Sequence, residues 1–140
     1  MNESEALASA LSTEHQAIYA YGVLGAHLDD RARLPALEAF DAHRRRRDAL
    51  LAALRTRRLP TPGPAASYDV TVASPTQARA LAVRVETEVG VRWRDVVGAT
   101  DDPRLRALSI PALQDSAVRA ARWRRAAGTT PATVALPGTG

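Results

Sequence analysis

Apolar residues recur every three or four positions along most of this chain, and this spacing predicts helices. The clearest case is the stretch 4–28, where the spacing alternates between four and three residues. Its seam consists of Leu7, Leu11, Glu14, Ile18, Tyr21, Gly25 and Leu28. A seam of this kind is typical of a helix that packs against neighbouring helices in a bundle.

Three further stretches have the same spacing, and we expect helices at 34–58, 75–99 and 103–127. No alternation typical of strands competes with this interpretation. The last two stretches each begin with a capping residue followed by proline, at Ser74 and Asp102. A cap of this kind satisfies free backbone N–H groups, and proline fits the first helical position, so both helix starts are well marked.

The connections between the four expected helices are short, long and short. The middle connection, residues 59–74, is rich in proline and has no helical spacing. When extended it reaches roughly 50 Å, which exceeds the length of a helix of roughly 24 residues. The sequence therefore predicts one all-α domain over 1–140, a ferritin-like four-helix bundle of two antiparallel helical hairpins joined by this crossover loop. A plain up-down bundle with a flexible middle loop is the alternative, and residues 128–140 are expected to form an extended tail.

Composition narrows the possible chemistry. The chain of 140 residues has no cysteine, which excludes disulfides, thiolate metal sites and a cysteine nucleophile. It has no run of about 18 apolar residues, so we expect no membrane-spanning helix. Its first residues, MNESEALASAL, are acidic and lack the features of a signal peptide. We therefore expect a cytoplasmic protein.

The chain is moderately basic. Its formal net charge is +4, and all nineteen basic residues are arginines. Arginine in place of lysine is typical of GC-rich genomes, and a charge of this size is ordinary for a soluble domain. An arginine-rich nucleic-acid binder therefore stays an alternative and is not the main interpretation.

Four acidic residues carry the candidate chemistry. Glu14, Asp41, Glu88 and Asp115 each lie near the middle of a different predicted helix, on the face expected to point inward. Bundles with two iron or manganese ions use one Glu from each of two helices and Glu-x-x-His from each of the other two. The four acids therefore resemble the carboxylate part of a di-metal centre.

The imidazole ligands of such a centre are missing from the expected positions, which hold Arg44 and Val118. Neither side chain can bind a metal, because valine has no donor atom and arginine has no free lone pair. The hypothesis is that arginines neutralise the buried acids in place of metal ions, since the guanidinium group matches carboxylate geometry. The expected buried ion-pair network comprises Glu14, Asp41, Arg44, Glu88, Asp115, Arg119 and Arg122.

The three histidines are not expected to replace the missing ligands. His43 follows Asp41 by two positions, about 200° around the helix, so it is expected to face away from the acids. His15 lies beside the seam rather than on it, and His27 lies near a helix end. All three are expected at the surface or between helices.

Several longer segments carry a resemblance to a known family. The segments are EHQAIYAYGVLGAHLDD, DAHRRRRDALLAAL, AVRAARWR and TVALPG, and they resemble a ferritin-like family of unknown function from actinobacteria. The resemblance covers nearly the whole chain and implies a ferritin-like four-helix bundle. It implies no activity. Relative to ferritins and rubrerythrins, the chain departs at Arg44 and Val118, so the resemblance does not extend to iron oxidation.

Together these features favour a non-catalytic, metal-free bundle that acts in binding or scaffolding, is a homodimer and uses no cofactor. The alternative is a di-metal oxidase or storage protein, with iron or manganese held by Glu14, Asp41, Glu88 and Asp115. The sequence does not indicate which protein or small molecule is the partner.

Overall fold

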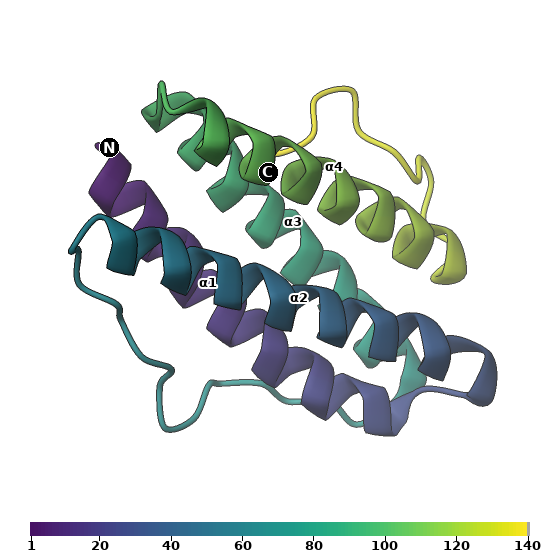
Figure 1. The fold of residues 1–140 in the computed structure, drawn as a ribbon. Coiled ribbons are helices and arrows are strands. Elements are labelled where there is room, and N and C mark those ends of the chain that lie inside the picture. Colours follow the sequence, from purple (N-terminus) through teal and green to yellow (C-terminus); the bar gives the residue numbers. More distant parts are fainter. Residues whose placement is uncertain (140) are drawn as a thin grey trace.

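The computed structural model describes residues 1–139, and its regular structure is four long helices (Figure 1). The helices are α1 (Glu3–Leu24), α2 (Asp30–Thr56), α3 (Pro75–Ala99) and α4 (Pro103–Ala126), with a short 3-10 turn, η1 (Gly25–His27), after α1. None of residues 1–139 lies in a strand. The all-α prediction is therefore confirmed. Gly140, the last residue of the predicted tail, lies outside the described residues.

The helix starts follow the capping residues. The side chain of Ser74 accepts a hydrogen bond from the backbone N–H of Gln77, and that of Asp102 accepts one from Arg104. Both caps were expected, and α3 spans the expected residues. The expected start of α2 at residue 34 is wrong, because Asp29 caps the helix through the N–H of Ala32 and lets it begin four residues earlier.

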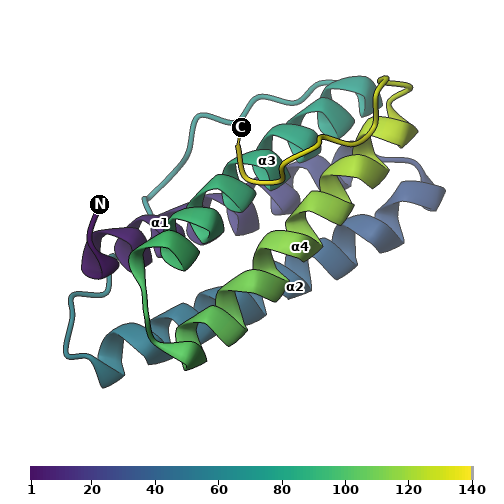
Figure 2. The same cartoon turned by 90° about the horizontal axis from the view of Figure 1, so that it is seen from above.

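Three pairs of helices make the main packing contacts of the bundle. α1 packs against both α2 and α3, α3 packs against α4, and α2 and α4 barely touch. Consecutive helices run in opposite directions within the pairs α1–α2 and α3–α4 (Figures 1 and 2). The long connection between α2 and α3 runs beside α1, where Nε2 of His15 lies 3.1 Å from the carbonyl oxygen of Pro62. After α4 the tail turns back over α3 and α4 (Figure 2).

Within the described residues, no helix has both the length and the apolar composition needed to cross a membrane.

Small side chains dominate the buried faces of the last three helices. The buried alanines there are Ala36, Ala39, Ala42, Ala78, Ala82, Ala112 and Ala120. Alanine favours the helix and lets neighbouring backbones approach closely. Two larger leucines of α2 lie outside the core, since Leu34 is 62% and Leu37 56% exposed. The space between the helices is filled by a few large side chains, and several of these are polar.

Arg57 connects three segments at the end of the bundle where α1 begins. Its Nε donates to Oε1 of Glu3 at 3.0 Å, and its guanidinium group also donates to Asp102. Thr100 donates to the other oxygen of Glu3 at 2.6 Å. The cluster therefore ties the start of α1 and the end of α2 to the turn between α3 and α4.

We expect Arg57→Ala to lower the free energy of unfolding by about 1 kcal/mol, because the ion pairs are partly exposed and screened by water. Urea unfolding followed by circular dichroism measures this loss, which should shrink in high salt. Arg55→Ala is the matched control, since Arg55 is exposed on the same turn of α2. An equal loss in the two variants would contradict a specific role for Arg57.

Candidate functional site

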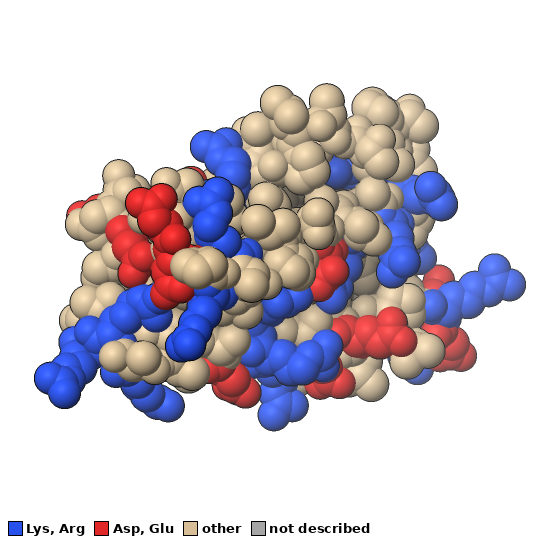
Figure 3. Space-filling view, turned by 45° about the horizontal axis from the view of Figure 1, so that its top comes forward, with Lys and Arg blue, Asp and Glu red and all other residues tan. Residues whose placement is uncertain are grey.

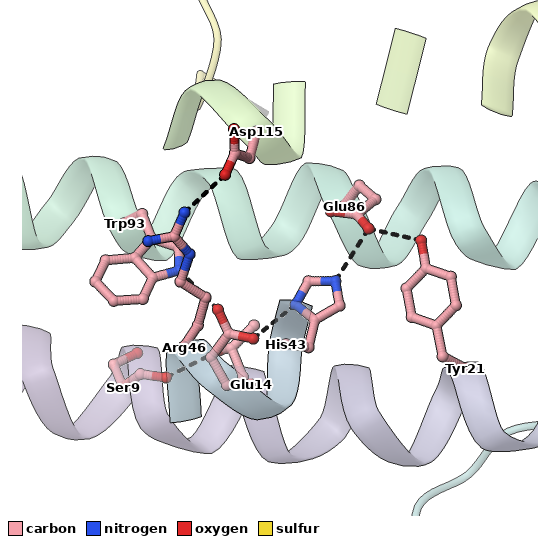
Figure 4. Close-up of polar contacts among 9 residues, drawn as sticks. Ser9, Glu14, Tyr21, His43, Arg46, Glu86, Trp93 and Asp115 are labelled. Carbon is pink, nitrogen blue, oxygen red and sulfur yellow. Dashed lines mark hydrogen bonds and ion pairs between the residues drawn. The ribbon is translucent and has the colours of Figure 1, made fainter. Parts of the chain in front are cut away.

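A buried polar network crosses the middle of the bundle (Figure 4). Glu14 of α1, His43 of α2 and Glu86 of α3 lie at its centre, and each is 1% exposed. Charged side chains are rarely buried to this degree unless they are paired. The network is therefore the most unusual feature of the core and the candidate functional site.

His43 bridges the two carboxylates. Its Nδ1 lies 2.7 Å from Oε2 of Glu14, and its Nε2 lies 3.0 Å from Oε1 of Glu86. Ionised carboxylate oxygens only accept hydrogen bonds, so both ring nitrogens must donate. The arrangement therefore calls for the imidazolium form, which carries one positive charge between two negative ones.

Three further side chains donate hydrogen bonds to this centre. The indole N–H of Trp93 donates to Oε1 of Glu14 at 2.7 Å, and the hydroxyl of Tyr21 donates to Oε1 of Glu86 at 2.6 Å. Trp123 in turn donates to the Tyr21 oxygen at 2.9 Å. The network thus extends from α1 to α4, and each carboxylate accepts a hydrogen bond from a neutral donor as well as from His43.

One oxygen of the network has no protein partner. Oε2 of Glu86 is buried and accepts no hydrogen bond from the described residues. Glu86 also lines a cavity of about 120 Å³ between α3, α4 and the tail. A cavity of this size has room for water. At the mouth of the cavity, Arg124 donates to the hydroxyl of Thr87 at 3.1 Å.

The network raises the pKa values of His43 and Tyr21. Burial alone would lower the pKa of His43, but the charges of Glu86 and Glu14 and their hydrogen bonds outweigh it and raise this pKa from 6.5 to about 9. Burial, together with the charge of Glu86, raises the pKa of Tyr21 well above its ordinary value. His43 is therefore charged and Tyr21 neutral at neutral pH.

The helical spacing explains how these side chains reach the core. Glu14 lies one turn beyond Leu11 on the seam of α1, and both are buried. His43 lies on the buried face of α2 with Ala39 and Leu50, and Glu86 lies one turn beyond Ala82. Since residues three or four apart share a face of a helix, each polar residue takes a position where an apolar one would be expected.

Comparison with known proteins assigns the chain to a family. A family model described as "Domain of unknown function (DUF4439)" matches residues 6–140. The chain belongs to the DUF4439 family. It is also similar to a crystal structure of a conserved hypothetical protein, rv2844, from Mycobacterium tuberculosis, with 36% sequence identity and a TM-score of 0.87. The match covers 96% of each chain. No curated protein matches the chain.

Only one of the four acids expected in the interior of this DUF4439 protein lies there. Glu14 is buried, whereas the side chains of Asp41, Glu88 and Asp115 are 49, 48 and 50% exposed. The prediction of four interior acids is therefore wrong. The expected inward faces of α2, α3 and α4 are rotated from the real ones, because leucine and valine mark the core poorly when many of the buried residues are alanine.

The expected arginine network is also absent among the described residues of the DUF4439 protein. Arg44 lies 3.9 Å from Asp41 on the surface of α2, and Asp115 pairs with Arg46, not with an arginine of α4 (Figure 4). Arg119 is half-buried and Arg122 is exposed, and neither has an ion pair within residues 1–139. The core carboxylates are paired with His43 instead.

His43 lies between helices, as expected, but the expectation that it faces away from the acids is wrong, because it contacts Glu14 and Glu86. His43 and Asp41 lie on opposite sides of α2, as expected. The buried side is the one that carries His43, not the one that carries Asp41. The signal was present in the sequence, since Ala36, Ala39, His43 and Leu50 follow one another at helical spacing. The same difference occurs on α3. The expected interior acid was Glu88, and the buried acid is Glu86, two positions earlier.

The donor atoms of the network do not converge on one point. No group of three or more histidine or acidic side chains within residues 1–139 has the geometry of a metal site. The donor set also does not fit two metal ions, which require about four carboxylates and two imidazoles, whereas the core offers two carboxylates and one imidazole. What the arrangement can do is hold a proton tightly between two carboxylates.

Proposed function

We propose that this protein is a non-catalytic, ferritin-like four-helix bundle in which the Glu14–His43–Glu86 network takes the place of a di-metal centre, and that it acts in binding or scaffolding. The single observation that carries this proposal is the position of His43. Both of its ring nitrogens are engaged by carboxylates, so it offers no lone pair to a metal ion.

The layout of the network supports a ferritin-like origin. A di-metal bundle takes one Glu from each of two helices, and here Glu14 of α1 and Glu86 of α3 fit that half of the pattern. α2 supplies a histidine, but Phe40 lies three positions before His43, where the pattern has Glu. On α4 the buried position at this level is Ser116, which is a poor ligand.

The arrangement of the chain supports the same proposal. The connections are short, long and short, and the long one spans the bundle beside α1 (Figure 2). Two helical pairs joined by one long crossover are typical of ferritin-like folds. The relative from Mycobacterium tuberculosis agrees with an actinobacterial family. The cytoplasmic location and the homodimer expected from the sequence stay predictions.

Elemental analysis tests the metal-free core. We expect protein purified without a chelating tag to contain far less than one iron or manganese ion per chain, and its melting temperature to be unchanged by added Fe²⁺ or Mn²⁺. A ligand that binds only the folded state raises that temperature, so an unchanged value means no tight site.

The control for surface binding is the double variant His15→Gln/His27→Gln, which keeps the core network and removes the other imidazoles. About two metal ions per chain in this variant, with an oxygen-dependent absorption change, would overturn the proposal in favour of the di-metal oxidase.

A further inference from the structure

A second feature of the molecule meets the buried network at Trp123 alone among the described residues. A cleft of about 560 Å³ opens between the start of α2 and the end of α4, the two helices that barely touch. Pockets that hold small molecules have volumes of about 300–1,000 Å³. The cleft is therefore large enough for a ligand of modest size.

The lining of the cleft is positively charged. It contains four arginines and two acids, which leaves a formal charge of +2. Arg79 pairs with Asp29 at 3.1 Å, which neutralises one of each. The other three arginines, Arg31, Arg119 and Arg122, have no ion pair within residues 1–139. Arginine side chains gather on the face between α4 and α2, with acidic ones interspersed (Figure 3).

The positions of two of these arginines favour joint recognition of one group. Arg119 and Arg122 are three residues apart on α4, so they share one face of the helix. A guanidinium group binds a carboxylate or phosphate through two parallel hydrogen bonds. Unpaired guanidinium groups on one wall of a cleft are thus suited to an anion.

The rest of the lining is apolar. Pro35 and Ala32 of α2 and Ala126 and Trp123 of α4 supply this part of the lining. Trp123 is 5% exposed, and its indole N–H donates to the hydroxyl oxygen of Tyr21, which fixes the orientation of the ring. A ligand that fills this space needs an apolar body as well as a charge.

We propose that the cleft between α2 and α4 binds a small organic anion, a carboxylate or phosphate carried on a flat apolar body. The charged group lies against Arg119 and Arg122, and the apolar body lies over Trp123. The cleft is separate from the buried carboxylates, so metal in the core would overturn the proposed function and leave this inference standing.

Three probes separate the contributions of charge and of the apolar body. Phenyl phosphate has both, inorganic phosphate has only the charge, and benzyl alcohol has only the apolar body. We expect phenyl phosphate to bind with a dissociation constant below about 1 mM by calorimetry and to change the tryptophan emission. We expect the other two to bind at least about tenfold more weakly. Equal binding of either simpler probe would overturn the proposal.

A pair of double variants tests the location. Arg119→Gln/Arg122→Gln should weaken phenyl phosphate at least about tenfold, because it removes charge-assisted hydrogen bonds. Arg104→Gln/Arg125→Gln changes the net charge equally on the same helix but outside the cleft lining, and should weaken binding less than about twofold. Equal weakening in both would mean general charge attraction and would overturn the proposal.

An amide-shift map of the unaltered protein tests the location without any substitution. Phenyl phosphate should shift the amides of residues 29–38 and 119–126 more than those elsewhere. Shifts centred on another part of the surface would also overturn the assignment.

Discussion

Replacing His43 by glutamine should lower the free energy of unfolding by about 3–5 kcal/mol at pH 7. The substitution removes the positive charge between Glu14 and Glu86 and leaves two carboxylates facing each other in the core. Such carboxylates either repel or take up a proton, and both outcomes favour the unfolded state. Urea unfolding followed by circular dichroism measures the loss.

His27→Gln is the matched control. His27 lies in the short turn after α1, is half-buried and has no side-chain hydrogen bond among the described residues. Its substitution should change the stability by less than about 0.5 kcal/mol, as surface substitutions usually do. A loss below about 1 kcal/mol for His43→Gln would show that the pairing of His43 contributes little.

The stability of the protein should fall as the pH rises from 6.5 to about 9. The pKa of His43 is 6.5 when unfolded and about 9 in the folded protein, so the folded state binds the proton more tightly. The stabilisation is fully present below pH 6.5 and is lost as the pH passes through 9. A shift of this size corresponds to roughly 3 kcal/mol.

The ionisation of Tyr21 also lowers the stability of the folded protein, but at higher pH than His43 does. Its raised pKa means that the folded state keeps the phenolic proton, so stability falls further once unfolded tyrosine ionises near pH 10. Unfolding curves between pH 6 and 9.5 therefore isolate the contribution of His43. In His43→Gln, the free energy of unfolding should depend little on pH over this range. If the stability of the unaltered protein does not change with pH here, the imidazolium assignment is wrong.

The rotation of each helix shows where sequence reasoning is reliable. In α1 the seam was placed correctly, because Leu7, Leu11 and Tyr21 are large and mark the buried face. In α2 the exposed Leu34 and Leu37 suggested the wrong face. Both faces of α2 carry apolar residues, and only packing against α1 selects the face with Ala36, Ala39 and His43.

The meeting of His43 with two carboxylates could not be predicted from local spacing. Glu14 and His43 are 29 positions apart, and His43 and Glu86 are 43 apart. Whether such distant residues touch depends on the relative rotation and height of three helices. A shift of one residue in the buried face moves each side chain by about 100°, enough to exchange His43 for Arg44, and a shift of two residues exchanges Glu86 for Glu88.

The amino-acid sequence by itself determined the local features of this protein: four helices, their capped starts at Ser74 and Asp102, the long connection between α2 and α3, and the buried Glu14. These depend on helical spacing and on hydrogen bonds between near neighbours. The tertiary structure alone decided that His43 bridges the core carboxylates and that Arg119 and Arg122 line a cleft. Those outcomes depend on how alanine-rich helices rotate against one another, and small side chains leave that rotation undetermined until the helices pack.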